Sequence, residues 1–174
     1  ANQIYDEMIS FASYAFNKSH AAAYSVVAME TGWLKRYHPV PFMAAIMNSV
    51  FGNSEKIAAY IQYCRGRNIP ILPPSVNTST WKFTVEKQQL GIRFGLGAVK
   101  GVGAGAVEAI VSERLKGSYT DIFDFCRRIN TEAVNKRVVD SLIRAGAFDC
   151  TGAKRSQMML VYEAAMDSAA TQRK

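Results

Sequence analysis

A glycine-rich segment at residues 96–110 carries the residue types best suited to hold an anion. Gly101-Val102-Gly103 follows an apolar stretch and precedes a segment rich in Ala, Val and Ile that is typical of a helix. Glycine permits positive φ and lets a ligand approach the backbone closely. We therefore expect Gly101 and Gly103 to form a tight turn with positive φ, anchored in the core by Val102. The N–H groups that open the next helix are then placed to bind a phosphate.

Lysine and arginine residues lie on both sides of this segment. Lys100 adjoins the turn, and Lys136 and Arg137 follow in the second half of the chain. Further basic residues in this half include Arg127, Arg128, Arg144, Lys154 and Arg155. Gathered on one face, such side chains bind phosphates with salt-sensitive affinity, whereas scattered charges are merely solvated. The net charge of +7 favours nucleic acid as a partner, ahead of a membrane surface.

The glycine spacing resembles the helix-hairpin-helix motif, which binds a duplex by its backbone without reading the bases. The DNA-binding candidates are Lys100, Gly101, Val102, Gly103, Gly105, Lys136 and Arg137. A flexible connector is one alternative. A dinucleotide-binding loop is less favoured, because Ala106 stands where that fingerprint requires its last glycine. A weaker second copy is expected around Gly146, although a helix-capping glycine explains that residue equally well.

No residue pattern indicates a catalytic or metal site. Asp121 and Asp124 lie one helical turn apart among apolar residues, so we expect surface and capping acids. The cysteines at positions 64, 126 and 150 lack the spacing of zinc ligands and favour a reducing compartment. A helix-hairpin-helix DNA glycosylase, with one of these aspartates acting on a flipped base, is an alternative function. A third is a non-catalytic DNA- or protein-interaction module, although residues 157–162 fit the core better than a binding peptide.

Lys18-Ser19-His20 is a second candidate anion site. Ser19 is a candidate N-cap, and the two flanking residues would add positive charge to a helix N-terminus. From spacing alone, a capping Ser19, a solvated Lys18 and a packed His20 are favoured.

The patterning predicts a mainly α fold with a small β-hairpin. Helices are expected at residues 4–17, 20–35, 41–50, 55–67, 104–116, 121–128 and 131–145, and from residue 154 onward. A short strand at residues 69–72 precedes a hairpin formed by residues 81–85 and 90–94. We expect two domains, residues 1–95 and residues 96–174. No apolar run reaches the roughly 18–20 residues that span a bilayer, so no membrane partner is expected.

Several blocks, in one order, resemble the family C replicative polymerases, the alpha subunits of bacterial DNA polymerase III. These blocks are residues 16–24, 33–35, 37–39, 42–45, 71–77, 94–98 and 142–149. The first reads Phe-Asn-Lys-Ser-His-Ala-Ala-Ala-Tyr, and the last reads Leu-Ile-Arg-Ala-Gly-Ala-Phe-Asp. The resemblance covers essentially the whole chain. Because the sequence begins at Ala1 without an initiator Met, we expect a piece of a longer protein.

The resemblance implies a fingers fragment followed by a tandem helix-hairpin-helix region. It implies that Lys18, His20 and nearby Tyr14 bind the incoming nucleotide. The parent would be a cytoplasmic DNA-directed DNA polymerase that uses Mg²⁺, and its catalytic palm would precede this segment. Expected partners are primer-template DNA, the incoming dNTP and, in the parent, the sliding clamp and other replicase subunits. The fragment itself would need no cofactor and would be inactive alone.

Overall fold

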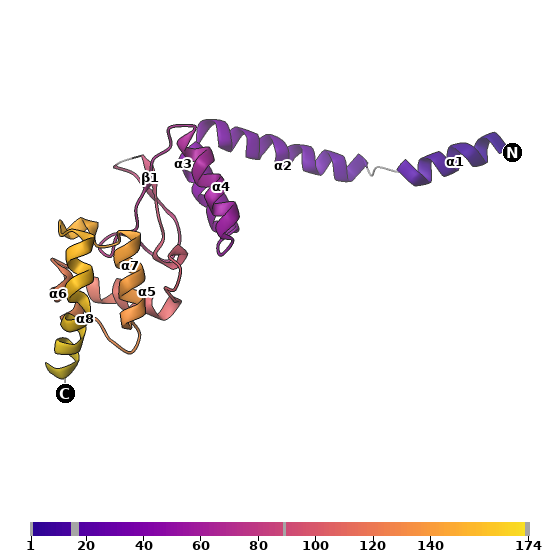
Figure 1. Cartoon of the computed structure of the whole chain (residues 1–174). Coiled ribbons are helices and arrows are strands. Elements are labelled where there is room, and N and C mark those ends of the chain that lie inside the picture. The colour runs from indigo at the N-terminus through magenta and orange to yellow at the C-terminus, as the bar shows by residue number, and fades with distance from the viewer. Residues whose placement is uncertain (1, 15–17, 89, 173–174) are drawn as a thin grey trace. The chain divides into compact units, whose positions relative to one another are not determined.

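The computed structural model describes residues 2–14, 18–88 and 90–172, with residues 10–14 described by their backbone. The chain divides into two compact units, Ala1–Pro39 and Val40–Lys174 (Figure 1). The predicted fold class, mainly α with a small β-hairpin, is confirmed.

The first unit contains helices α1 (Asn2–Tyr14) and α2 (Lys18–Tyr37). Helix α2 has no buried residue. It already includes Lys18, so Ser19 lies inside the first turn and the predicted N-cap at Ser19 is wrong.

Helix α3 (Pro39–Ser49) starts at the last residue of the first unit and continues into the second. It contributes with α4 (Ser54–Arg65) to one hydrophobic core. Met43 and Met47, four residues apart on one face of α3, are fully or almost fully buried. The side chain of Asn53 caps α4 by accepting a hydrogen bond from the Lys56 N–H at 3.0 Å.

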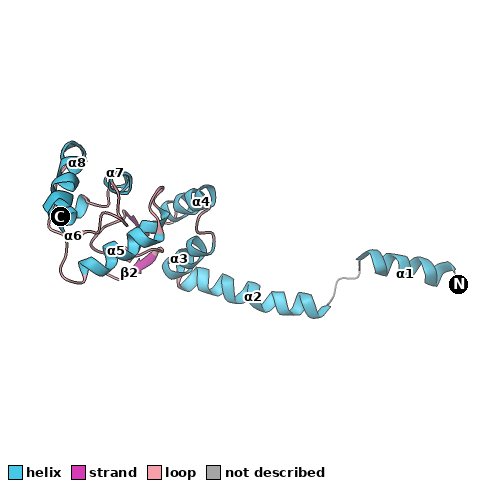
Figure 2. Ribbon diagram, turned by 90° about the horizontal axis from the view of Figure 1, so that it is seen from below, coloured by secondary structure: helices cyan, strands magenta, loops and turns pink. Residues whose placement is uncertain are grey.

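A three-stranded sheet completes this core. It contains β1 (Ile71–Leu72), β2 (Thr84–Glu86) and β3 (Gly91–Arg93) in the order β1-β3-β2. The predicted hairpin is confirmed, because β2 and β3 pair antiparallel. The first strand adds a parallel pairing to β3. Strands are a small part of the unit, as the colouring of Figure 2 shows.

The remaining helices enclose a second core. They are α5 (Ala104–Arg114), α6 (Ile122–Arg128), α7 (Lys136–Ala145) and α8 (Arg155–Gln172). A short 3₁₀ helix, η1 (Leu96–Ala98), precedes α5, and another, η2 (Asp149–Thr151), connects α7 to α8. Helix α8 packs against α6 and α7 (Figure 1). The fully buried rings of Phe125 and Phe148 meet edge to face at 4.9 Å between centroids in this core.

Helix α7 starts later than predicted. It was expected from Thr131, but it begins at Lys136 after a turn. Asn130 stabilises this turn by accepting a hydrogen bond from the Glu132 N–H at 2.9 Å. Asn135 then caps the helix by accepting from the Val138 N–H at 3.1 Å. Side chains that bind nearby backbone N–H groups in this way compete with helix continuation.

The expected domain boundary, between residues 95 and 96, lies inside the second unit. Phe94 packs against both hydrophobic cores, which are therefore continuous there. The assignment of separate roles to residues 1–95 and 96–174 stays a prediction.

Candidate functional site

The glycine-rich segment forms a tight turn between η1 and α5. The carbonyl of Val99 accepts a hydrogen bond from the Val102 N–H at 3.1 Å. Gly101, at the third position of this turn, has φ +88°, as predicted. Gly103 has φ −88° and is the N-cap of α5, so the predicted positive φ at Gly103 is wrong. A single left-handed residue, Gly101, is therefore enough for the chain to reverse direction at this turn.

Two buried valines fix the turn and leave its tip exposed. Val102 is 6% exposed, which confirms its predicted place in the core, and Val99 is also buried. Lys100 and Gly101 between them are exposed. Just before the turn, the backbone of Gly97 lies against the Trp81 ring so closely that no side chain would fit. The tip is thus held by packing on both sides.

The N-terminus of α5 is open to a ligand. Gly103, Ala104 and Gly105 are exposed, and nothing lies within 4 Å of where a side chain of either glycine would begin. Gly103 has no side chain that could occupy the N–H groups of the first turn, and this turn has no acidic residue. N–H groups of a first helical turn have no carbonyl partner within the helix and carry partial positive charge. This end of α5 therefore suits an anion.

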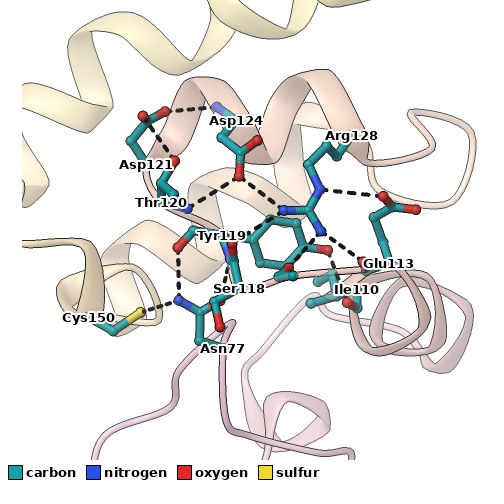
Figure 3. Close-up of polar contacts among 11 residues, drawn as sticks. Asn77, Ile110, Glu113, Ser118, Tyr119, Thr120, Asp121, Asp124, Arg128 and Cys150 are labelled. Atoms are coloured by element: carbon teal, nitrogen blue, oxygen red, sulfur yellow. Dashed lines mark hydrogen bonds and ion pairs between the residues drawn. The ribbon is translucent and has the colours of Figure 1, made fainter. Parts of the chain in front are cut away.

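Arg128 holds the opposite end of α5 (Figure 3). Its Nη2 donates hydrogen bonds to the carbonyls of Glu113 at 2.8 Å and Gly117 at 2.7 Å. Its guanidinium also lies 4.6 Å from the centre of the Tyr119 ring. A cation beside the last carbonyls of a helix is favourable, because that end carries partial negative charge. Arg128 therefore positions α5 instead of facing a ligand.

Both aspartates considered as catalytic candidates take part in structural contacts (Figure 3). Asp121 caps α6 by accepting a hydrogen bond from the Asp124 N–H at 2.8 Å, which confirms its predicted capping role. The Asp124 carboxylate accepts from the Thr120 N–H at 3.2 Å and from Arg128 Nη1 at 3.1 Å. Within the described ranges, no group of three or more His, Cys, Asp and Glu residues could hold a metal ion.

Tyr119 joins three segments beneath this network (Figure 3). Its hydroxyl donates to the Ile110 carbonyl of α5 at 3.0 Å. The Asn77 side chain binds both its backbone groups: Oδ1 accepts from the Tyr119 N–H at 2.8 Å, and Nδ2 donates to the carbonyl at 2.9 Å. Burial raises the pKa of Tyr119 to about 12, outweighing the nearby Arg128 charge. This pairing of Asn77 with Tyr119 could not be predicted from local patterns, because it joins residues far apart in the chain.

The start of α7 repeats the arrangement at the start of α5. Val134 is fully buried and directly precedes the Asn135 cap, as Val102 precedes the Gly103 cap. Val138 and Val139, three and four residues after Asn135, are buried. The corresponding residues after Gly103, Ala106 and Val107, are buried as well. The second copy is therefore the start of α7, with Asn135 in the place of Gly103.

The second copy was expected around Gly146, and that placement is wrong. Gly146 is the C-cap of α7, with φ +83°. The capping role considered as the alternative is the observed one.

The structure brings some of the candidate basic residues together. Lys100 and Arg137, with Ser141 and Arg144, line a groove of about 320 Å³ between the turn and α7. Lys136 is directed elsewhere, since its Nζ lies 2.7 Å from Asp167 of α8. Lys136 and Arg137 occupy the first turn of α7, where cations oppose the helix dipole unless an anion is bound.

The three candidates for nucleotide binding belong to the first unit. Lys18 and His20 are exposed on α2, and the His20 ring lies 4.3 Å from the Tyr24 ring, centroid to centroid. The side chain of Tyr14 lies outside the described residues. The nucleotide site stays a prediction.

Residues 157–162, considered above as a binding peptide, belong to α8 and contribute to the second core. Met158 and Tyr162 are 1% and 6% exposed, as their spacing predicted. No described helix is both long enough and apolar enough to cross a lipid bilayer.

Comparison with known proteins gives two results. A family model described as a helix-hairpin-helix motif matches residues 68–158. The chain is also similar to proteins named DNA polymerase III subunit alpha. That of Vibrio cholerae is 44% identical over 170 residues, which is 97% of this chain and 15% of the relative. That of Bacillus subtilis is 40% identical over 169 residues, again 97% of this chain and 15% of the relative. The chain thus spans about a seventh of the length of these relatives.

Proposed function

Because the chain belongs to the helix-hairpin-helix family, we propose that it binds the phosphate backbone of duplex DNA through its glycine turn. The turn, Val99–Gly103, and the first residues of α5 form the contact surface. The observation that carries this proposal is an exposed tip held between two buried valines and followed by an open helix N-terminus. Backbone N–H groups in such a position bind a phosphate whatever the base sequence.

The function within a longer protein follows from the relatives' name. We propose that the chain is a segment of a cytoplasmic DNA-directed DNA polymerase and grips the primer-template duplex there. The residues described in this chain do not fit a two-metal site, because Asp121 and Asp124 are engaged in capping and ion pairing. We therefore assign Mg²⁺ chemistry to other parts of the polymerase, along with contacts to the sliding clamp and other subunits.

Duplex binding is tested by fluorescence anisotropy with labelled duplex and single-stranded DNA across a salt series. We expect the duplex to bind more tightly and its affinity to fall steeply with salt, because each phosphate contact releases counterions. Gly103→Val should weaken duplex binding, since a branched side chain fills the open space in front of α5. Gly32→Val on α2 is the matched control and should leave affinity unchanged. Equal affinities for all three proteins would refute the turn as the contact surface.

Nucleotide binding by the first unit is a separate proposal. Lys18 and His20 are exposed near the start of α2, where the Lys18 ammonium reinforces the helix dipole toward a triphosphate and the His20 ring can donate a hydrogen bond. In a full-length alpha subunit, Lys18→Ala should raise the apparent KM for nucleotide. Lys35→Ala, at the other end of α2, is the control. An unchanged KM for Lys18→Ala would remove this assignment.

A further inference from the structure

The groove between the turn and α7 has the shape and the side chains of a phosphate subsite. The turn contributes Val99, Lys100 and Gly101 to its lining, and α7 contributes Arg137, Ser141 and Arg144. It therefore joins the first hairpin to the helix of the second copy.

Positive charge dominates this groove. Lys100 and Arg137 are exposed, and neither forms an ion pair with any part of the chain that the structure describes. The third cation, Arg144, donates through Nε to Asp140 at 2.8 Å. That single bond fixes the guanidinium and leaves its Nη groups for a ligand. The lining thus contains three cations and no carboxylate, and Asp140 pairs with only one of the three, an imbalance that an anion in the groove would relieve.

Ser141 is the groove's neutral donor. It lies so close to the turn that a methyl group on Gly101 would be 3.2 Å from its Oγ. A hydroxyl between two guanidinium groups adds a hydrogen bond for a phosphate oxygen.

We propose that Arg137, Ser141 and Arg144 bind one phosphate of the duplex backbone in this groove, next to the phosphate held by the turn. Lys100 and Gly101 belong to both surfaces, so a strand held at the turn passes directly by the groove. This inference rests on the proposed duplex binding and adds a second contact made by side chains.

The first test compares two arginines by the salt dependence of duplex affinity. Arg144→Gln and Arg137→Gln should each lower the slope of log affinity against log salt by about 1. Arg127→Gln removes the same charge from a different groove, between α6 and α8, and should leave the slope unchanged. Because the Arg144 side chain is 68% exposed, its replacement should preserve the fold, and thermal unfolding checks this.

The second test places a negative charge in the groove. Ser141→Asp should weaken duplex binding by roughly tenfold or more, because like charges would face each other. Ser168→Asp, in the α6–α8 groove, is the control and should have a much smaller effect. Millimolar inorganic phosphate at constant ionic strength should not displace the duplex, whereas strong competition would indicate a site for free phosphate and overturn the duplex assignment.

The outcomes separate the two proposals. If Gly103→Val weakens binding while the groove variants behave like their controls, the groove proposal fails and duplex binding at the turn stands. If the unmodified chain binds no duplex at low salt, both proposals fail.

Discussion

The hydroxyl of Ser141 on α7 faces the position where a side chain on Gly101 would begin. A methyl group on Gly101 would lie 3.2 Å from that oxygen, and Gly101 also has φ +88°. Gly101→Ala should therefore destabilise the fold by about 1–2 kcal/mol, the cost of a left-handed residue with a Cβ. Urea unfolding followed by circular dichroism measures this. An unchanged midpoint would mean that the turn relaxes to another conformation.

Gly105→Ala should separate folding from binding. Gly105 lies in the first turn of α5, and the space beside it is open. Alanine there should stabilise the fold by about 0.5–1 kcal/mol, because glycine loses more conformational freedom in a helix. Duplex affinity should nevertheless fall, since the added methyl group keeps a phosphate away from the backbone. If stability rises and affinity does not change, Gly105 does not contact the duplex.

Arg128→Met should be strongly destabilising. The guanidinium binds carbonyls of Glu113 and Gly117 and the carboxylate of Asp124, with only 21% of the side chain exposed. Losing these charge-assisted hydrogen bonds should cost about 2–4 kcal/mol. The control is Arg127→Met on the exposed neighbouring residue, which should cost less than about 1 kcal/mol. Similar losses in the two variants, measured by chemical denaturation, would contradict the positioning role.

Tyr119 should make stability sensitive to alkaline pH. Burial raises its pKa from 10.0 to about 12, so the folded state retains the phenolic proton that the unfolded state releases. Its contribution to stability is full below pH 10 and declines as the pH rises from 10 to 12. Tyr119→Phe should flatten the stability curve in this window.

At neutral pH, Tyr119→Phe should also cost about 1 kcal/mol, because the Ile110 carbonyl loses its donor. Unfolding free energies of both proteins from pH 8 to pH 12 provide the measurement. Parallel curves would show that Tyr119 ionises equally in the folded and unfolded states.

Local patterns predicted much of the fold. The period-two residues around Val85 and Ile92 predicted the hairpin, and these two residues pair in the observed register. The burial of Val102 followed from its place between glycines in an apolar segment. Such features depend on residues close together in the chain.

Features that depend on distant residues could not be predicted. Ile71 pairs with Ile92 in a parallel register, and Asn77 binds the backbone of Tyr119. The second hairpin was misplaced for another reason. Its cap is Asn135, whereas the first cap is Gly103. Asparagine and glycine both serve as N-caps, so a search for glycine alone cannot find the repeat.

The glycines of the first hairpin are subject to two different selective pressures. At Gly97 any side chain would overlap the Trp81 ring, so substitution is opposed by the need to fold. At Gly105 the space is open, so only an approaching ligand would oppose substitution. A descendant that kept this fold but lost its nucleic-acid partner should therefore retain Gly97 while Gly105 drifts. The order in which Gly97 and Gly105 change in a lineage would then indicate when that lineage lost nucleic-acid binding.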